Sequence, residues 1–343
     1  MNKVFIVAEI SANHNQDYEQ AEKLVRIAKE VGADAVKLQT YTPDTLTINC
    51  DRPEFIIKGG TPWDGKTLYE LYGEAYMPWE WQPRLKKVAD EIGIELFSTP
   101  YDKTAVDFLE NMGVQRYKIA SFELVDLELI GYVASKGKPI IMSTGMATLP
   151  EIKEAVSVAE EYGTTDITLL KCTSAYPAKP EEMNLLTVQH LAMQFLLLPG
   201  WCWLSVGISD HTLGIIAPIV ATSLGATMIE KHLTISKSLD SSFSLTPNEF
   251  EVMVVGIRSA EKMLGEGIIG ATDREVGSKV FRRSLFVVED IKKGEEFTEQ
   301  NVRSIRPGDG LLPKHLSTVL GNKSRQNIER GTPLQWEMLS IAD

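Results

Sequence analysis

Eight short runs of mostly apolar or β-branched residues recur along the chain, and segments with helical spacing separate them. The runs cover residues 4–10, 35–40, 95–100, 116–121, 139–145, 167–174, 204–211 and 228–234. Runs of this kind are typical of strands that are buried on both faces of a sheet. In the first intervening segment, apolar residues recur at helical spacing, at Ala21, Leu24, Val25 and Ala28. The alternation predicts an α/β fold with a parallel sheet.

A glycine follows many of the predicted helices just before the next strand begins. These glycines are Gly32, Gly93, Gly113, Gly137, Gly163 and Gly225. Glycine suits this place because it adopts the left-handed conformation that ends a helix. Successive strand–helix units predict a (β/α)8 TIM barrel over residues 1–265, with its active site at the carboxyl ends of the strands.

Beyond the barrel the pattern changes. The last barrel helix is predicted at residues 248–265, and a polar, glycine-bearing linker follows at 266–280. Residues 281–343 alternate short strands with turns, including a KKGE turn at 292–295, and predict a separate small β-rich domain. Within the barrel, the loop at 41–77 is unusually long, and long loops at this end of a barrel build or cover the substrate site.

Composition and charge exclude some kinds of partner. The formal net charge of −12 disfavours nucleic acid and anionic membranes, but it is compatible with a small anion in a locally basic pocket. The most apolar stretch, residues 193–206, is too short and too interrupted to span a bilayer, and no pattern assigns it a role. A strand begins almost at the first residue, so we expect no signal peptide. Three cysteines without CxxC spacing indicate the reducing cytoplasm: Cys50, Cys172 and Cys202.

Residues able to do chemistry gather where the predicted strands end. They are Glu9, Lys37, Gln39, Thr99, Lys118, Ser121, Glu123, Ser143, Tyr176, Ser209, His211 and His232. The carboxyl ends of the strands meet at one rim of a barrel, so we expect most of these side chains to face one pocket. Two lysines and several hydroxyls suit a phosphate together with a carboxylate. Two histidines and two glutamates suit a divalent cation, with a carboxylate as ligand, partner or base.

The metal prediction depends on two histidines together. A lone histidine in a strand is more often a structural residue than a ligand. His211 and His232, however, end consecutive strands at equivalent positions, which favours a shared metal ion. His14 would either line the mouth of the barrel or form a hydrogen bond within its loop. We expect His190 and His315 to be structural or exposed.

Eight motifs in order resemble the sialic acid synthase family, whose members condense phosphoenolpyruvate with an amino sugar to make nonulosonic acids. The motifs are AEISANHN, KLQT, FSTPYD, YKIAS, STGMA, CTSAYP, SDHT and EKH. The resemblance covers nearly the whole chain, since the C-terminal part is similar to the family's antifreeze-like (SAF) domain. Residues 63–81 and 239–247 resemble the branch that makes pseudaminic acid. The implied substrate is 2,4-diacetamido-2,4,6-trideoxy-β-L-altropyranose, and the implied reaction breaks a C–O bond and releases phosphate.

The resemblance implies a role for each matching position. The phosphoenolpyruvate-binding positions match Lys37, Thr99, Lys118, Ser121, Ser143 and Ser209. Positions that bind a divalent metal, typically Mn²⁺ with Mg²⁺ or Co²⁺ as alternatives, match His211 and His232. Acidic catalytic positions match Glu9, Glu123 and Asp240, and sugar-contacting positions match Gln39 and Tyr176. Arg306 matches an arginine that reaches the sugar's N-acetyl group in the barrel of the other subunit, which implies a domain-swapped homodimer.

The chain departs from the family pattern in two places and leaves other functions open. Ser11 and Gln16 stand where members usually have glycine, and the loop between His232 and Asp240 is about three residues shorter than in some relatives. One alternative is an N-acetylneuraminate or legionaminic acid synthase. Another is a pyruvate aldolase with Lys118 as a Schiff-base lysine, and a non-enzymatic alternative is a carbohydrate-binding protein. The polar residues at all the strand ends speak against a mere scaffold.

Overall fold

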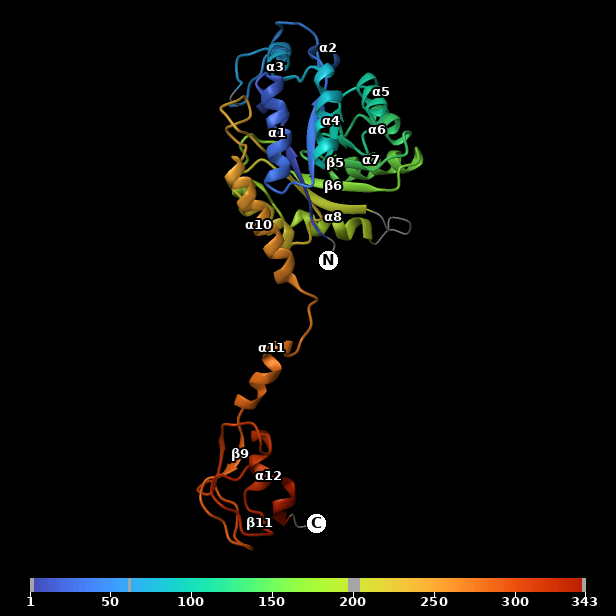
Figure 1. Ribbon diagram of the computed structural model, residues 1–343. Coiled ribbons are helices and arrows are strands. Elements are labelled where there is room, and N and C mark those ends of the chain that lie inside the picture. Colours follow the sequence, from blue (N-terminus) through green and yellow to red (C-terminus); the bar gives the residue numbers. More distant parts are fainter. Residues whose placement is uncertain (1–2, 61–62, 197–203, 341–343) are drawn as a thin grey trace. The chain divides into compact units, whose positions relative to one another are not determined.

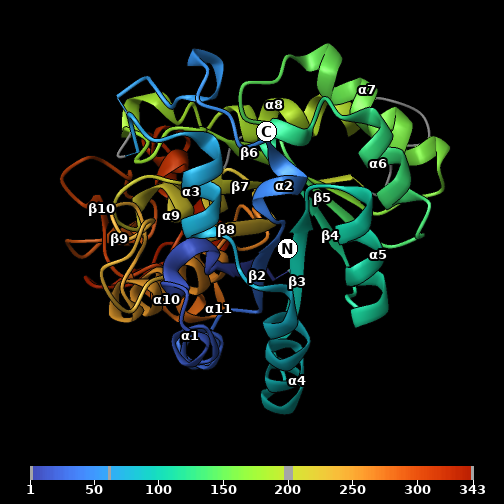
Figure 2. The same ribbon diagram turned by 90° about the horizontal axis from the view of Figure 1, so that it is seen from above.

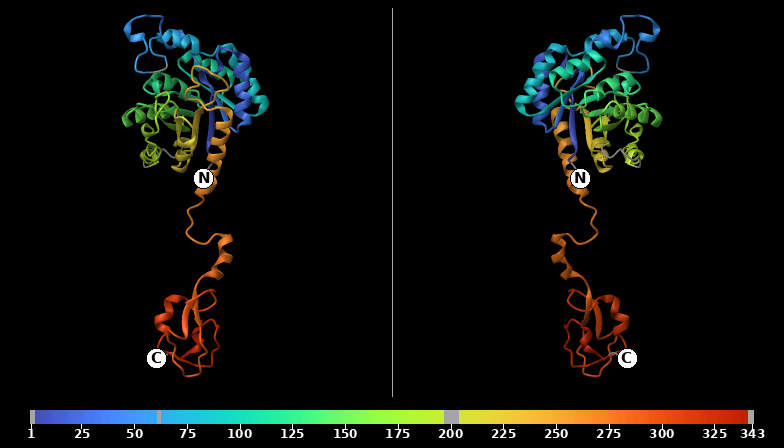
Figure 3. Two further views of the ribbon diagram at one scale, coloured as in Figure 1. Left: turned by 90° about the vertical axis from the view of Figure 1, so that its left-hand side faces the viewer. Right: turned by 90° about the vertical axis from the view of Figure 1, so that its right-hand side faces the viewer.

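The computed structural model describes residues 3–60, 63–196 and 204–340. The chain divides into two compact units, Met1–Glu266 and Gly267–Asp343, and each is described by itself. Figures 1 and 3 show the ribbon of both units.

The first unit is a closed barrel of eight parallel strands, paired in the order of the sequence (Figures 1 and 2). The strands are β1 (Phe5–Glu9), β2 (Ala35–Thr40), β3 (Glu95–Pro100), β4 (Tyr117–Ile119), β5 (Ile140–Ser143), β6 (Ile167–Cys172), β7 (Leu204–Asp210) and β8 (Met228–His232). The barrel closes between β1 and β8, where Glu9 pairs with His232. The predicted fold class is confirmed, and each predicted run contains one of these strands.

Helices cover the outside of the barrel. They are α1 (Tyr18–Glu30), α4 (Gln82–Ile92), α5 (Lys103–Met112), α6 (Leu127–Ala134), α7 (Leu149–Glu161), α8 (Thr187–Leu196), α9 (Ile216–Ser223) and α10 (Pro247–Leu264). Helix α1 buries the four residues predicted from their spacing, and Asp17 caps it by accepting hydrogen bonds from the backbone N–H groups of Glu19 and Gln20. The six predicted helix-ending glycines all have positive φ.

The long loop after β2 has structure of its own. It contains α2 (Pro43–Leu46) and α3 (Leu68–Ala75), and an antiparallel bridge joins Ile56 to Thr67. Thr67 and Glu70 form a capping box that starts α3, because each side chain accepts from the other residue's backbone N–H. This loop reaches the barrel pocket described below.

The second unit has its own apolar core, which includes Leu285, Phe297 and Leu334. Two small antiparallel sheets pair β9 (Ser284–Val287) with β10 (Val302–Ile305) and β11 (Lys323–Ser324) with β12 (Leu339–Ser340); the short helix α12 is Leu316–Val319. The predicted KKGE turn is present, since Glu295 N–H donates to the Lys292 carbonyl at 3.0 Å.

Two segments differ from a plain sequence interpretation. The predicted linker contains the short helix α11 (Asp273–Val276), which Thr272 and Glu275 start with a capping box. In the apolar stretch, residues 197–203 lie outside the described residues, while Met193 of α8 is exposed. None of the helices described here combines the length and the apolar character needed to cross a membrane.

Candidate active site

A pocket of about 420 Å³ opens at the carboxyl ends of the barrel strands. Predicted residues from β2 to β8 and from the loops that follow them line it: Lys37, Gln39, Lys118, Ser121, Glu123, Ser143, Tyr176, Ser209, His211, His232 and Asp240. The structure therefore brings most of the predicted site together. The exceptions are Glu9, Thr99 and Arg306.

Glu9 and Thr99 contact the side chain of Lys37 and do not line the pocket. The Lys37 ammonium forms an ion pair with Glu9, donates to Thr99 Oγ1 at 3.3 Å and lies 3.9 Å from Glu230 Oε1. Burial lowers the pKa of Lys37, but the carboxylates of Glu230 and Glu9 outweigh it and raise that pKa above its usual value. Burial also raises the pKa of Glu9 to about 7, against the pull of Lys37. The charge of Lys37 is thus balanced by the protein itself.

Lys118 has no such partner. Lys118 is only 2% exposed. Its ammonium donates to Ser143 Oγ at 2.6 Å and to the Ile119 carbonyl at 3.1 Å. Among the described residues it forms no ion pair, and burial lowers its pKa. The carboxylates of Glu230 and Glu9 act on Lys118 only from beyond ion-pair distance. A buried cation whose direct contacts are neutral is costly, so this part of the pocket favours an anionic ligand.

The loop after β5 packs closely against two serine side chains of the pocket, Ser121 and Ser174. Gly145 N–H donates to Ser121 Oγ at 3.2 Å. A Cβ atom at Gly145 would lie 2.3 Å from Ser174 Oγ and 2.8 Å from Ser121 Oγ. Only glycine allows the backbone to approach these hydroxyls so closely, and both serines line the same pocket as Lys118.

The two predicted metal ligands face each other. The ring centroids of His211 and His232 are 5.3 Å apart, and both rings line the pocket. His211 Nδ1 lies 3.0 Å from the Thr173 carbonyl, so in the neutral ring Nδ1 donates and Nε2 keeps its lone pair. Burial lowers the pKa of His211, but its contacts with Cys172 and the Thr173 carbonyl outweigh burial and raise that pKa. His232 Nδ1 is buried without a hydrogen-bond partner in the described part of the chain, and it lies 4.0 Å from Asp240 Oδ2.

This donor set fits a divalent cation. Burial lowers the pKa of His232 well below its usual value, so its imidazole is neutral, as a metal ligand must be. Within residues 3–60, 63–196 and 204–340, no three or more His, Cys, Asp or Glu side chains already stand close enough to hold a metal ion. The chain therefore offers two imidazoles with Asp240 nearby, and the remaining coordination positions would be open to substrate and water.

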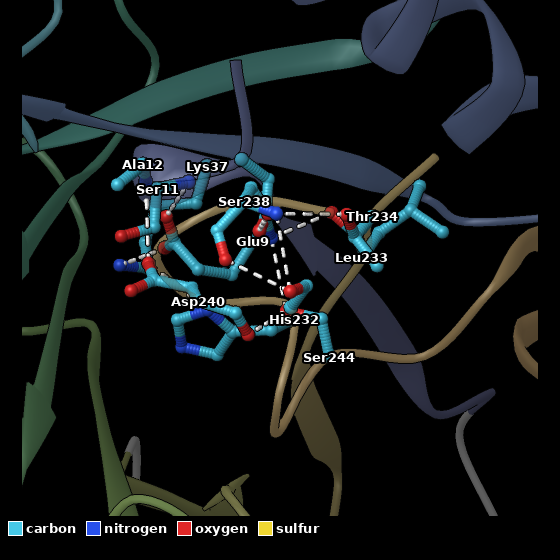
Figure 4. A network of polar contacts seen from close by, with 12 residues as sticks. Glu9, Ser11, Ala12, Lys37, His232, Leu233, Thr234, Ser238, Asp240 and Ser244 are labelled. Carbon is cyan, nitrogen blue, oxygen red and sulfur yellow. Dashed lines mark hydrogen bonds and ion pairs between the residues drawn. The ribbon is translucent and has the colours of Figure 1, made fainter. Parts of the chain in front are cut away.

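Asp240 is placed by contacts between the loops after β1 and β8 (Figure 4). Its Oδ2 accepts from Ala12 N–H at 3.2 Å, and its carbonyl accepts from Ser244 Oγ at 2.7 Å. Asn13 joins the same loops, because its amide donates to the Leu233 carbonyl and to Ser244 Oγ, both at 2.9 Å. The short loop after His232 thus still brings Asp240 to the pocket.

In the loop after β1, Ser11 and Gln16 adopt a backbone conformation that glycine favours. Ser11 and Gln16 have φ values of 36° and 55°, in the left-handed region that favours glycine. Ser11 keeps a contact there, since its N–H donates to Glu9 Oε1 at 2.7 Å. His14 is fully buried outside the pocket lining and its Nδ1 accepts from Gln16 N–H at 3.1 Å, so the loop interpretation of His14 is confirmed.

Glu123 differs from Glu9 because it lines the pocket directly. Burial raises its pKa to about 7, and its Oε2 has no hydrogen-bond partner among the described residues. A carboxylate with this pKa is suited to general base chemistry near neutral pH.

Glu230 and the apolar wall of the pocket were not predicted from the sequence. Glu230 precedes His232 by two residues and so faces the same side of β8, a signal that period-two spacing offered. It accepts from Ser209 Oγ at 2.9 Å; burial raises its pKa, but Lys118 and Lys37 outweigh this and lower it. Loop and other residues that also line the pocket include Leu46, Ile57, Trp63, Leu68, Leu71, Tyr72, Cys172 and Phe243.

The remaining predicted residues lie elsewhere. Arg306 is exposed and belongs to the second unit. His190 is exposed, and His315 packs against Trp336 with ring centroids 5.0 Å apart, as expected of residues outside the site.

Comparisons with known proteins agree with this geometry. The model of the NeuB family matches residues 24–269, and that of the SAF domain matches residues 282–340. The chain is 45% identical to the pseudaminic acid synthase of Campylobacter jejuni (strain 81-176), over 97% of this chain and 96% of that protein. It is 46% identical to the pseudaminic acid synthase of Helicobacter pylori, over 96% of each chain.

A solved structure extends the comparison. The N-acetylneuraminic acid synthetase of Leptospira borgpetersenii is 28% identical and matches with a TM-score of 0.71, over 81% of this chain and 90% of that chain. The family resemblance drawn from the eight motifs is confirmed: the chain belongs to the NeuB family and carries a C-terminal SAF domain.

Proposed function

We propose that this protein condenses phosphoenolpyruvate with 2,4-diacetamido-2,4,6-trideoxy-β-L-altropyranose to give pseudaminic acid and phosphate. The observation that carries the proposal is a buried, unpaired Lys118 in the same pocket as the facing imidazoles of His211 and His232. An anion site beside a cation site is what the reaction requires. The near full-length similarity to pseudaminic acid synthases supports the choice of product.

Phosphoenolpyruvate supplies the anion. Its carboxylate and phosphate would pair with the ammonium of Lys118, with the hydroxyls of Ser121 and Ser143 as further donors. Lys37 adds a second cation to the pocket, but Glu9 and Glu230 already offset its charge. We therefore assign the main anion contact to Lys118.

We propose that His211 and His232, with Asp240 beside them, hold a divalent cation, Mn²⁺ before Mg²⁺ or Co²⁺. When bound, the cation would supply Lewis-acid polarisation of the sugar's aldehyde. The chain's own part is to hold the two imidazoles toward the pocket and to keep Asp240 next to them.

The proposed reaction forms a C–C bond and breaks a C–O bond. C3 of phosphoenolpyruvate attacks the aldehyde carbon of the open-chain sugar, and the aldehyde oxygen takes a proton from solvent and becomes a hydroxyl. Water then adds to the electron-poor C2. Glu123 takes the proton of that water, because it lines the pocket with a pKa of about 7 whereas Glu9 lies behind Lys37. The C2–O bond to phosphate breaks, and the bridging oxygen leaves with phosphate.

The apolar wall favours a deoxy sugar. Leu46, Ile57, Leu68 and Leu71 from the long loop face the pocket together with Phe243. Such a surface suits the C6 methyl and the acetamido methyls of the proposed sugar, while a C6 hydroxyl there would lose hydrogen bonds to water. This disfavours a neuraminate synthase. A legionaminic acid synthase, whose sugar is also deoxygenated at C6, differs only in stereochemistry.

We further propose a homodimer in which Arg306 of one copy contacts the sugar in the barrel of the other, with Gln39 and Tyr176 contacting the sugar from the barrel itself. Arg306 is exposed, so its guanidinium is available for such a contact. We place the protein in the cytoplasm; Cys50 and Cys172 are free thiols, which suits a reducing compartment.

The test is phosphate release from phosphoenolpyruvate with three sugars, each with and without Mn²⁺. The sugars are the proposed altrose derivative, the corresponding mannose derivative and N-acetylmannosamine. We expect release with the altrose derivative and Mn²⁺, and little with the others. A preference for another sugar would move the protein to that branch. No release with any sugar, or trapping of pyruvate on Lys118 by borohydride, would overturn the proposal.

A further inference from the structure

An ion pair lies on the side of β7 and β8 that faces away from the pocket. Lys231 Nζ is 2.6 Å from Asp210 Oδ2, and both side chains are 0% exposed. The two residues are direct partners in the ladder between β7 and β8. Each therefore sits between site residues: Asp210 between Ser209 and His211, and Lys231 between Glu230 and His232. Neither lines the pocket.

Both residues of the pair also form hydrogen bonds to the backbone of Thr212, next to His211. Lys231 Nζ donates to the Thr212 carbonyl, and Asp210 Oδ1 accepts from Thr212 N–H at 2.9 Å. The contacts thus fix the residues immediately before and after His211. Lys231, which contacts both Asp210 and Thr212, immediately precedes His232. These contacts therefore connect the backbone at His211 with the backbone at His232.

His211 needs this connection because strand pairing does not reach it from β8. The strand β7 ends at Asp210, and its last ladder pair with β8 is Asp210 with Lys231. His232 is held on its other side, by its pairing with Glu9 of β1. Apart from the ion pair, the backbone of His211 is anchored through its carbonyl, which accepts from Ala178 N–H at 3.0 Å. Ala178 belongs to the loop after β6, not to β8.

Stability alone does not explain the pair. A fully buried ion pair loses the hydration of two charges, and an apolar pair of similar volume is often as stable or more stable. What an ion pair adds is a defined geometry, since its hydrogen bonds are directional. We propose that Lys231 and Asp210 are positioning residues that fix how His211 and His232 face each other. The inference rests on the proposed function, in which these imidazoles hold a divalent cation.

The experiment replaces the pair with apolar residues, in the double variant Asp210→Leu/Lys231→Met. A control, Glu95→Leu/Arg116→Met, removes a partly buried ion pair of 2.6 Å elsewhere in the first unit. Free Mn²⁺ is measured by electron paramagnetic resonance as each protein is titrated, and thermal unfolding is followed by circular dichroism. We expect the double variant to unfold cooperatively near the wild-type temperature but to bind Mn²⁺ about 10- to 100-fold more weakly, as loss of supporting contacts around a metal site does. The control should bind as the wild type does.

A second variant covers the case in which the double variant does not fold. Asp210→Asn keeps an oxygen for Thr212 N–H and removes only the charge that pairs with Lys231, and we expect weaker Mn²⁺ binding from it as well. A folded variant of either kind with wild-type Mn²⁺ affinity would overturn the inference and leave the proposed function standing. A wild-type protein that binds no Mn²⁺ would overturn the proposed metal site, and this inference with it.

Discussion

Lys37 on β2 and Lys118 on β4 are both buried lysines that line one pocket, but the chain surrounds them differently. Lys37 is paired with Glu9 and lies near Glu230, and its pKa is raised. Lys118 contacts only a hydroxyl and a carbonyl, and its pKa is lowered. The difference indicates that Lys37 helps to hold the folded barrel, whereas Lys118 keeps its charge for an anionic substrate.

Lys118→Met should have the largest effect on activity. We expect kcat/KM for phosphoenolpyruvate to fall by about 10³-fold, because the main group that stabilises the substrate's charge is removed. The free energy of unfolding should rise by about 1 kcal/mol or more, since a buried unpaired charge is removed. Steady-state kinetics and chemical denaturation measure the two effects. A variant that is less stable and still active would contradict the assignment.

Lys37→Met should act in the opposite direction on stability. It leaves Glu9 without its ion-pair partner and Glu230 with Lys118 as its one nearby lysine, so we expect the free energy of unfolding to fall by about 3–5 kcal/mol at pH 8. The loss should shrink as pH is lowered from 8 toward 5, because without Lys37 burial raises the pKa of Glu9 further, and the protonated Glu9 no longer needs a partner. Denaturation curves at several pH values test this. An equal loss at pH 5 and pH 8 would show that Glu9 is not the group concerned.

The two glutamates with raised pKa values extend the comparison. Glu123→Gln should lower kcat by about 10²-fold and abolish the rise of activity with pH near 7, where the wild-type carboxylate loses its proton and becomes a base. It should also stabilise the protein by roughly 2–3 kcal/mol above pH 7 and not below pH 4.5, because the folded state holds the proton more tightly than the unfolded state does. Glu9→Gln should keep the pH dependence. Profiles of kcat against pH test this. If the rise of activity near pH 7 were lost in the Glu9 variant alone, Glu9 and not Glu123 would be the base.

The smallest effects should come from the hydroxyls beside the lysines. Ser143→Ala removes the 2.6 Å contact to Lys118, and we expect kcat/KM for phosphoenolpyruvate to fall about tenfold. Thr99→Val removes the longer 3.3 Å contact to Lys37 and should change that parameter by about twofold or less. Kinetics of both variants at saturating sugar provide the measurement. Equal losses would mean that both lysines bind the substrate alike.

Much of the fold and of the site could be predicted from the sequence for a simple reason. Buried parallel strands must be apolar, and a barrel brings their carboxyl ends to one rim, so Lys118, His211 and His232 could be placed in one pocket from their positions along the chain. Their partners could not be. Spacing along the chain does not encode distances across the barrel. Those distances decide which carboxylate pairs with Lys37 and that Lys118 forms no ion pair with a described residue.

Other misses have equally specific causes. Glu230 shares a face with His232, and strict use of the two-residue period would have found it. The apolar wall from the long loop depends on how α3 folds back over the pocket, which local pattern does not determine. The pairing of Asp210 with Lys231 needs the register of β7 against β8, which appears only once the barrel is closed.

The most direct test of the account is a crystal structure of the protein with phosphoenolpyruvate and Mn²⁺, with anomalous scattering used to locate the metal. The account predicts Mn²⁺ bound by His211 and His232, and phosphoenolpyruvate oxygens in contact with Lys118. Metal bound away from these histidines, or phosphoenolpyruvate bound without contact to Lys118, would contradict it.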